Sequence, residues 1–219
     1  MQDQTADIEW RDGVIPVSTM FDDPYFSLDN GMEETRHVFL GGNDLPARFR
    51  DGFHVAELGF GTGLNFLVAL QAFRASGCGG RLRFTSFEAY PMAMDDLHAA
   101  LRAFDGLPDD LAQLEVFPQH LEGADFDLRV VIGDARMTLP AWDGAADAWF
   151  LDGFSPAKNP ELWSPELMEK VAAHTAQGGT AATYTAAGFV RRGLADAGFE
   201  VSRVQGYGRK RHMTRAVLL

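Results

Sequence analysis

The sequence predicts a doubly wound α/β domain, in which a mostly parallel sheet carries helices on both faces. Three observations support this fold class. Short apolar runs alternate with helical stretches from about residue 51 onward, several runs end in glycine or an acidic residue, and the last two extended runs follow each other without a helix between them. We therefore expect a Rossmann-like core over residues 51–219, with a seven-stranded sheet that includes a C-terminal antiparallel strand. Residues 1–50 are expected to form a small N-terminal extension of the same single domain, 1–219.

The N-terminal extension contains the first predicted elements. Two extended segments over 8–17 flank Asp12-Gly13, a dipeptide typical of a tight hairpin turn. Residues 22–31 are too polar and broken for a core element, and residues 32–40 are compatible with a helix.

The core elements follow in strict alternation. Ser164 and Pro165 have the residue types preferred at a helix N-cap and first turn, Gly178-Gly179 is expected to close that helix, and Gly198 is expected to stop the next one. The predicted strands are 53–58, 82–87, 128–132, 146–151, 180–185, 200–205 and 215–219. The predicted helices are 64–74, 91–104, a short turn near 136, one that begins at 164, and 190–197.

Composition and charge narrow the class of protein. The formal charge is −12, yet residues 191–219 hold seven basic side chains against two acidic ones, which makes the C-terminal end locally basic. The single cysteine and the six histidines show no disulfide framework and no metal-ligand spacing, so we expect no metal. No signal peptide and no membrane-length apolar run are present, so a cytoplasmic protein without a membrane association is expected.

A glycine-rich loop between a predicted strand and a predicted helix is the sharpest local motif. Its G-x-G-x-G spacing differs from the G-x-G-x-x-G that is typical of hydride-transfer enzymes. Glycines allow a tight turn and a close approach of a ligand to the backbone, and the helix that follows presents free N–H groups. The predicted cofactor-binding residues of this segment are Glu57, Gly59, Phe60, Gly61, Gly63 and Asn65.

Three acidic residues stand at the carboxyl ends of later strands, where open α/β sheets bind ligands. Glu88 can bind both ribose hydroxyls, and Asp134, followed by Ala135, can accept a hydrogen bond from an adenine amino group. Asp152 closes the fourth strand. Because the chain lacks a phosphate-binding G-x-x-x-x-G-K-[ST] loop, these acids favour a cationic nucleoside cofactor without phosphates, S-adenosylmethionine.

The residues after Asp152 form a stiff loop with two prolines and two aromatic residues, 152–163. Alkyl amines are mostly protonated near neutral pH, so their methylation needs a group that aligns the amine and takes its proton. A carboxylate can do both, and we predict Asp152 as the catalytic residue. Whether it acts as a true general base or only orients the amine stays open at this point.

Several blocks of sequence together resemble the methyltransferase domain family of the bacterial tRNA 5-methylaminomethyl-2-thiouridine biosynthesis proteins. The blocks run from about residue 25 to residue 213 and comprise Tyr-Phe-Ser-Leu-Asp-Asn-Gly-Met-Glu-Glu-Thr at 25–35, the glycine loop, Phe-Leu-Asp-Gly-Phe-Ser-Pro-Ala-Lys-Asn-Pro at 150–160, Thr-Ala-Ala-Gly-Phe-Val-Arg-Arg-Gly-Leu at 185–194 and Gly-Tyr-Gly-Arg-Lys-Arg at 206–211.

The resemblance implies a class I methyltransferase fold and methyl transfer to the exocyclic amine of 5-aminomethyl-(2-thio)uridine at the tRNA wobble position. It also implies a partner, an FAD-dependent oxidoreductase domain or separate protein that acts upstream. Further residues implied by it are Asn30 and Glu34 at the cofactor, Phe26, Phe154, Pro156 and Lys158 at the substrate, and Arg191, Arg192, Arg209, Lys210 and Arg211 at tRNA phosphates.

Two alternatives stay open on the sequence. The same fold could serve a small-molecule amine N-methyltransferase, for which the basic C-terminal end would have no role. A non-catalytic tRNA-binding domain with a vestigial cofactor loop is the other alternative. Which tRNAs are used, whether thiolation is required, and the oligomeric state are not encoded in any motif.

Overall fold

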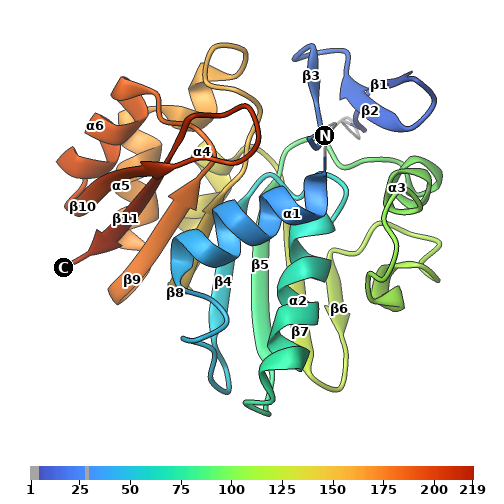
Figure 1. Cartoon of the computed structure of the whole chain (residues 1–219), viewed down its shortest axis with the longest axis horizontal. Coiled ribbons are helices and arrows are strands. Elements are labelled where there is room, and N and C mark those ends of the chain that lie inside the picture. The colour runs from blue at the N-terminus through green and yellow to red at the C-terminus, as the bar shows by residue number, and fades with distance from the viewer. Residues whose placement is uncertain (1–4, 28–29) are drawn as a thin grey trace.

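An eight-stranded sheet with helices on both faces forms the centre of the computed structural model, which describes residues 5–27 and 30–219 (Figure 1). Its strand order is β10-β11-β9-β8-β4-β5-β7-β6, and the neighbouring pairs from β9 to β7 are parallel. Strand β11 is antiparallel to both of its neighbours. The predicted fold class is therefore confirmed, including the antiparallel strand at the C-terminal end.

The elements of the central sheet and its helices have the following bounds. The strands are β4 His54–Leu58, β5 Leu82–Glu88, β6 His120–Glu122, β7 Phe126–Ile132, β8 Ala146–Leu151, β9 Thr175–Thr183, β10 Phe199–Gln205 and β11 His212–Leu218. The α-helices are α1 Gly31–Thr35, α2 Leu64–Ser76, α3 Met94–Leu101, α4 Ala135–Thr138, α5 Pro165–Ala173 and α6 Gly188–Asp196. Shorter helical turns are Arg36–Leu40, Gly41–Asn43, Asp109–Leu111, Leu139–Ala141 and Pro160–Trp163.

Two hydrophobic cores lie on opposite faces of the sheet. Successive side chains of a strand point to opposite faces, and in β8 Phe150 belongs to one core while Trp149 and Leu151 belong to the other. The first core packs α2 against the sheet through Phe66, and the second packs α5 through Leu167. Burial on both faces explains why the central strands read as continuous apolar runs in the sequence.

The N-terminal extension forms a separate three-stranded sheet, β1 Ile8–Arg11, β2 Ile15–Ser18 and β3 Asp23–Pro24. The predicted hairpin is confirmed, since Asp12 and Gly13 have φ of 52° and 69° between β1 and β2. The Asp23 carboxylate accepts a hydrogen bond from the backbone N–H of Ser155 at 2.7 Å. This contact fastens the extension to the loop that follows β8.

Three of the sequence predictions need correction. Gly178-Gly179 does not close a helix, because α5 already ends at Ala173 and the glycines lie inside β9. Gly178 has φ of 71° there, and the pairing of β9 with β8 shifts register at this point, so the pair forms a bulge. The helix predicted over 91–104 spans only Met94–Leu101. The helix predicted over 32–40 is confirmed, since α1 continues without a break into the π-helical turn Arg36–Leu40.

The third correction is the additional strand β6. It has three residues, two of them exposed, so it lacks the apolar run on which the strand predictions depend.

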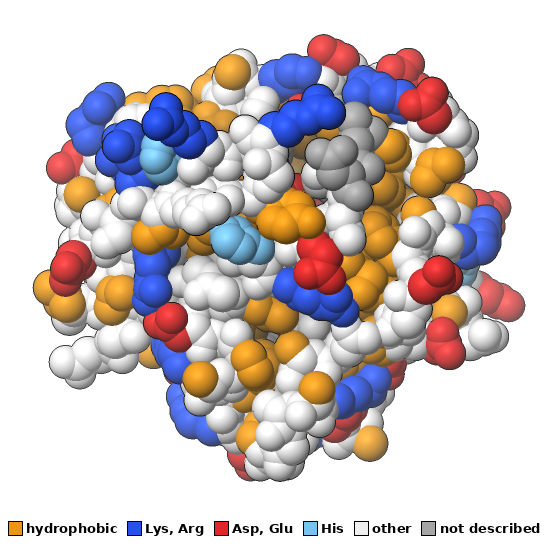
Figure 2. Space-filling model, in the orientation of Figure 1, with side chains coloured by type: hydrophobic (Ala, Val, Ile, Leu, Met, Phe, Trp, Pro, Cys, Tyr) orange, Lys and Arg blue, Asp and Glu red, His pale blue; other side chains and the backbone are white. Residues whose placement is uncertain are grey.

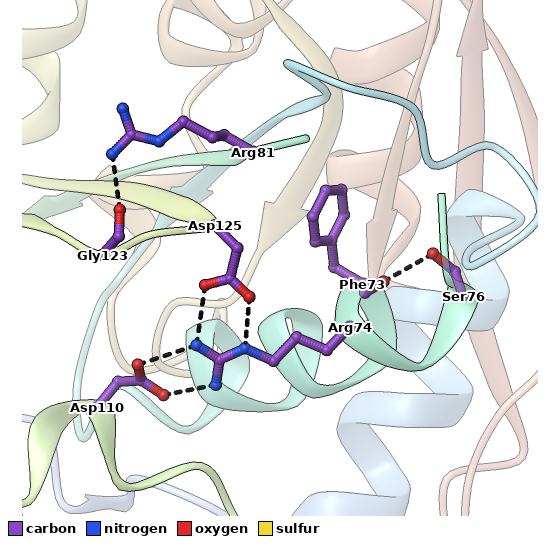
Figure 3. Close-up of polar contacts among 7 residues, drawn as sticks. All are labelled: Phe73, Arg74, Ser76, Arg81, Asp110, Gly123 and Asp125. Carbon is purple, nitrogen blue, oxygen red and sulfur yellow. Dashed lines mark hydrogen bonds and ion pairs between the residues drawn. The ribbon is translucent and has the colours of Figure 1, made fainter. Parts of the chain in front are cut away.

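The amino ends of the strands are joined by an ionic cluster far from the carboxyl ends. Arg74 on α2 makes ion pairs with Asp110 and Asp125, each at 2.7 Å (Figure 3). Arg81, shown in the same view, donates to the carbonyl of Gly123 at 2.7 Å. These contacts tie α2 to the segments before β6 and β7. Within the described residues, no helix is long and apolar enough to cross a membrane.

Candidate functional site

The glycine loop lies between β4 and α2, as predicted. Gly59 has φ of 91°, and a Cβ atom there would overlap the carbonyl oxygen of Asp152. Gly63 has φ of 77°, and its Cβ would lie 2.7 Å from Leu111 Cδ1. Both positions therefore need glycine, for the backbone conformation and for the space.

A cavity of about 880 Å³ opens above this loop, at the carboxyl ends of the parallel strands. This volume falls in the range of cofactor and small-molecule sites. Most of the predicted site residues line its wall, namely Phe26, Glu34, Gly59, Phe60, Gly61, Asn65, Glu88, Asp134, Ala135, Asp152, Phe154, Arg209 and Lys210.

Glu88 ends β5 beside the glycine loop. Its Oε2 accepts a hydrogen bond from the Gly61 N–H at 2.9 Å, and its Oε1 accepts one from the Tyr90 N–H at 2.8 Å. Burial raises the pKa of this carboxyl, and the backbone donors of the loop act in the opposite direction. The carboxylate thus braces the loop at the position where a ribose was predicted.

Asp134 caps the short helix α4 and is held by its own neighbour. Its carboxylate accepts from the Arg136 N–H and forms an ion pair with the Arg136 guanidinium at 2.6 Å. The hydrogen bond from Arg136 lowers the pKa of Asp134, which favours the ionised form of this carboxyl. The predicted contact with an adenine amino group stays a prediction.

Asp152 lies at the centre of a buried hydrogen-bond network. Its Oδ2 accepts from Asn65 Nδ2 at 2.6 Å, and the same nitrogen donates to Glu57 Oε1 at 2.8 Å. Glu57 Oε2 in turn accepts from the Ser86 hydroxyl at 2.7 Å, and Thr35 Oγ1 donates to Asn65 Oδ1 at 2.7 Å.

Burial raises the pKa of Asp152 from 3.8 to about 7, against the hydrogen bond from Asn65, which lowers it. Glu34 raises the pKa further and Lys210 lowers it. A carboxyl with such a pKa exchanges its proton near neutral pH, which suits a group that takes a proton from an amine.

Some predicted site residues lie outside the cavity wall. Glu57 is fully buried beneath the glycine loop, and burial raises its pKa well above the usual range. Asn30 caps α1 by accepting from the Glu33 N–H at 3.1 Å, and Lys158 pairs with Asp22 at 3.0 Å. The other predicted residues outside the wall are Gly63, Pro156, Arg191, Arg192 and Arg211.

Lys210 is the predicted basic residue that the structure brings closest to the acids. Its ammonium pairs with Glu34 at 2.6 Å and lies 4.1 Å from the centroid of the Tyr184 ring. The Tyr184 hydroxyl donates to the carbonyl of Gly153 at 2.7 Å, and burial raises the pKa of this tyrosine. Lys210 therefore joins α1 and the β10–β11 connection across the cavity.

The sequence predictions included Phe154 but not the aromatic residues that pack around it at the cavity, Phe21, Tyr25 and Tyr90. The Phe154 ring stacks on Phe21 at 4.8 Å and meets Tyr25 edge-on at 5.1 Å. Phe21 also contacts Tyr90 at 5.8 Å. Isolated aromatic residues in loops carry no periodic signal, and of the three partners only Tyr25 lies in a block that carried the resemblance.

The remaining basic residues gather on the C-terminal strands and α6. Desolvation lowers the pKa of His212, and the nearby Arg203, Arg211 and Arg191 lower it further. Figure 2 shows Lys and Arg side chains concentrated along the upper left of this face, over the region of α6, β10 and β11. Part of the local positive charge read from the sequence therefore lies together on this surface, while Lys210 lies in the cavity and Arg215 pairs with Asp44.

Comparisons with known proteins agree with this geometry. A family described as S-adenosyl-L-methionine-dependent methyltransferase matches residues 107–219. The chain is 46% identical to the tRNA 5-methylaminomethyl-2-thiouridine biosynthesis bifunctional protein MnmC of Caulobacter sp. (strain K31), over 99% of this chain and 39% of the relative. It is 45% identical to the protein of that name from Aeromonas salmonicida (strain A449), over 94% of this chain and 34% of the relative.

Two solved structures are similar to this chain in fold. The crystal structure of MNMC2 from Aquifex aeolicus superposes with a TM-score of 0.75 and 27% identity, over 99% of this chain and 72% of that one. TrmN from Thermus thermophilus, at 19% identity and a TM-score of 0.53 over 82% of this chain and 47% of that one, shares the fold. The chain spans little more than a third of the curated relatives that it matches. The resemblance expected from the sequence blocks is confirmed.

Proposed function

Since the chain belongs to the S-adenosyl-L-methionine-dependent methyltransferase family, we propose that it methylates the exocyclic amine of 5-aminomethyl-(2-thio)uridine at the tRNA wobble position. The observation that carries the proposal is the half-buried Asp152 carboxyl at the cavity wall, which Asn65 holds at 2.6 Å and whose pKa is raised to about 7. Support for the substrate comes from the curated relatives named as tRNA 5-methylaminomethyl-2-thiouridine biosynthesis proteins. The family membership confirms S-adenosylmethionine as the cofactor expected from the sequence.

The residues of the cavity fit this cofactor. Gly59 and Gly61 leave the loop backbone uncovered by side chains, and Glu88 provides a carboxylate at the end of β5. The wall is acidic at Glu34, Glu88 and Asp134, which suits a cationic ligand and opposes a polyphosphate. When bound, S-adenosylmethionine supplies an electrophilic methyl group on a sulfonium sulfur.

Asp152 has the chemistry that the amine requires. A protonated alkyl amine has no lone pair to donate, so a base must take one proton before or as the nitrogen reacts. Ionised Asp152 attracts the ammonium form and accepts its proton, and Phe154 in the same loop limits the space beside it. Burial of the carboxyl raises its proton affinity, which brings its pKa closer to the working pH.

The basic surface around Arg191, Arg203 and Arg211 supports a polyanionic substrate. The chain as a whole is acidic, with a formal charge of −12, so a concentration of positive charge near the cavity favours tRNA at this face. Arg192 and Arg209 are further proposed phosphate contacts.

The proposal extends to the organisation and partners of the chain. We propose that residues 1–219 work as one methyltransferase domain, because Ile8 and Tyr25 of the extension pack against the main core. An FAD-dependent oxidoreductase domain or protein upstream is proposed because the curated relatives are named as bifunctional and are longer than this chain. A cytoplasmic location is proposed on the same relatives.

The deciding experiment is mass spectrometry of wobble nucleosides after the chain acts on tRNA that carries 5-aminomethyl-(2-thio)uridine. A gain of one methyl group on that nucleoside, dependent on S-adenosylmethionine and abolished in Asp152→Ala, is the expected result. Methylation of free small amines without any on tRNA would favour the small-molecule enzyme. Failure of calorimetry to detect S-adenosylmethionine binding would favour a non-catalytic domain.

A further inference from the structure

Asn65 lies where the structure brings the buried carboxyl group of Glu57 close to the half-buried one of Asp152. It is the second residue of α2, is almost fully buried, and reaches Glu57 at the end of β4 and Asp152 after β8. The glycine-loop motif predicts that the Asn65 side chain binds the cofactor. Its contacts with protein groups point to a different use.

The hydrogen bonds of the Asn65 amide fix its orientation. A primary amide has two N–H donors and one carbonyl acceptor. One donor goes to Glu57 Oε1 at 2.8 Å, the other goes to Asp152 Oδ2 at 2.6 Å, and the carbonyl accepts from Thr35 Oγ1 at 2.7 Å. A reversed amide would turn its oxygen toward both carboxyl groups, so the Thr35 hydroxyl and the two acids select one rotamer together.

This arrangement distinguishes the two oxygens of Asp152. Oδ2 is held by Asn65, while no hydrogen bond to Oδ1 occurs among residues 5–27 and 30–219. The backbone of Asp152 is fixed too, because its N–H donates to the Leu58 carbonyl at 3.1 Å and its own carbonyl lies against Gly59. One carboxylate oxygen therefore remains to meet a ligand in the cavity.

We propose that Asn65 is a positioning residue for the methyl acceptor: it holds Asp152 Oδ2 so that Oδ1 receives the proton of the amine. This inference rests on the proposed role of Asp152. Asn65 acts through Asp152 and need not touch the cofactor. The sequence separation of 87 residues explains why no motif joins the two.

Other charged groups face Asp152 from the elements packed around it. Glu34 from α1 disfavours its ionised form, whereas Lys210 from the β10–β11 connection favours it. Asp152 in turn raises the pKa of the buried Glu57 carboxyl on β4. The Tyr184 hydroxyl lies near enough for Asp152 to raise its pKa. Among these groups Asn65 supplies the direct hydrogen bond to the ionised form of Asp152. Removal of the Asn65 amide should therefore raise the pKa of Asp152.

The first test measures the carboxyl group and not the reaction. The ¹³C resonance of the Asp152 carboxyl, identified by its disappearance in Asp152→Asn, is titrated in the full chain. In Asn65→Ala the pKa is expected to rise by about one unit, because the ionised form loses a hydrogen-bond donor. Ser86→Ala is the matched control, since Ser86 touches only the far oxygen of Glu57 and its removal should leave the Asp152 titration unchanged.

The second test measures methyl transfer to aminomethyluridine tRNA as a function of pH. In Asn65→Ala the rise of kcat with pH is expected to occur about one pH unit higher than in the parent, which matches the expected change in the pKa of Asp152. The affinity for S-adenosylmethionine should stay within about threefold of the parent. In the Asp152→Asn background the same substitution should have no further effect, because the residue through which it acts is gone. Thr35→Val, which removes only the donor to the amide carbonyl, should give a smaller shift in the same direction.

An unchanged Asp152 titration in both Asn65→Ala and Thr35→Val would overturn the proposal, as would an equal loss of transfer in the parent and Asp152→Asn backgrounds. If the parent chain does not methylate tRNA at all, the proposed function fails, and the titration alone still decides whether Asn65 controls Asp152. If Asn65→Ala does not fold, Thr35→Val decides in its place.

Discussion

Gly59 lies against the backbone carbonyl of Asp152, so the glycine loop and the predicted catalytic residue share one tight contact. Gly59 follows β4 and Asp152 follows β8, the two strands that pair in parallel at the centre of the sheet. The Asp152 N–H bonds to the Leu58 carbonyl at 3.1 Å, which sets the spacing between the two segments. Any residue larger than glycine at position 59 must move one of them.

We expect Gly59→Ala to reduce both stability and methyl transfer. Its φ of 91° is strained for alanine, and the new Cβ would displace Asp152. The conformational strain costs about 1–3 kcal/mol, and displacement of the carboxyl should lower kcat by about a hundredfold. Urea unfolding and labelled methyl transfer measure the two effects.

Gly77→Ala provides the control for that substitution. Gly77 ends α2 with φ of 66°, but nothing lies within 4 Å of its Cβ position. It should lose a comparable free energy of unfolding from φ strain and keep its transfer rate. An equal loss of activity in both variants would show that general instability, and not the contact with Asp152, is responsible.

Asp152→Asn is expected to lower the rate of methyl transfer by about 10²–10⁴, because the amide cannot accept the proton of the amine. The substitution keeps the size of the side chain, so S-adenosylmethionine should bind as it does to the parent. Calorimetry and single-turnover transfer assays separate binding from reaction. Retention of more than about a tenth of the parent rate would assign Asp152 to loop structure alone.

The pH dependence of activity and of stability should run in opposite directions. Transfer is expected to rise with pH through about 7, where Asp152 ionises. The folded chain binds the proton of Asp152 more tightly than the unfolded chain does, because the folded pKa is raised from 3.8 to about 7. The free energy of unfolding that this proton contributes is therefore fully present below pH 3.8 and is lost as pH rises through about 7. The parent chain should thus lose stability relative to Asp152→Asn between these pH values, by at most a few kcal/mol. Denaturant unfolding of both proteins from about pH 4 to 8 measures the difference, and parallel curves would refute the raised pKa.

Reversal of charge at Arg192 and Arg211 is expected to weaken tRNA binding without changing the affinity for S-adenosylmethionine. Removal of each phosphate contact should reduce the slope of log K against log salt by about one. Arg102→Glu changes an exposed charge at the end of α3, away from this surface, and serves as the control. Filter binding at several salt concentrations makes the measurement. Unaltered tRNA binding and turnover in the double variant would favour a small-molecule acceptor.

The sequence predicts what is local in the chain. The Asp12-Gly13 turn, the glycine loop and Glu88 at the end of β5 are each recognisable within a few residues, because turn geometry and strand ends depend on neighbours. Parallel alternation then brings Glu88, Asp134 and Asp152 to one edge of the sheet, which made most of the cavity wall predictable.

Contacts between distant segments were beyond such reasoning. Asn65 could be assigned to a glycine loop, but its bonds to Asp152 and Thr35 depend on how α2, β8 and α1 pack. The resemblance implies a phosphate contact for Lys210, and no motif predicts that its ammonium pairs with Glu34. Residue type gives the charge, and only the packed fold gives the partner.

The ion pair between Glu34 and Lys210 also makes the two ends of the chain depend on each other. These residues are 176 positions apart in the chain, yet they both line one cavity. Glu34 lies on α1, and Lys210 lies just before β11, the strand inserted between β9 and β10. The cavity wall is therefore assembled from both ends of the chain, and a truncation at either end would remove one partner of this pair.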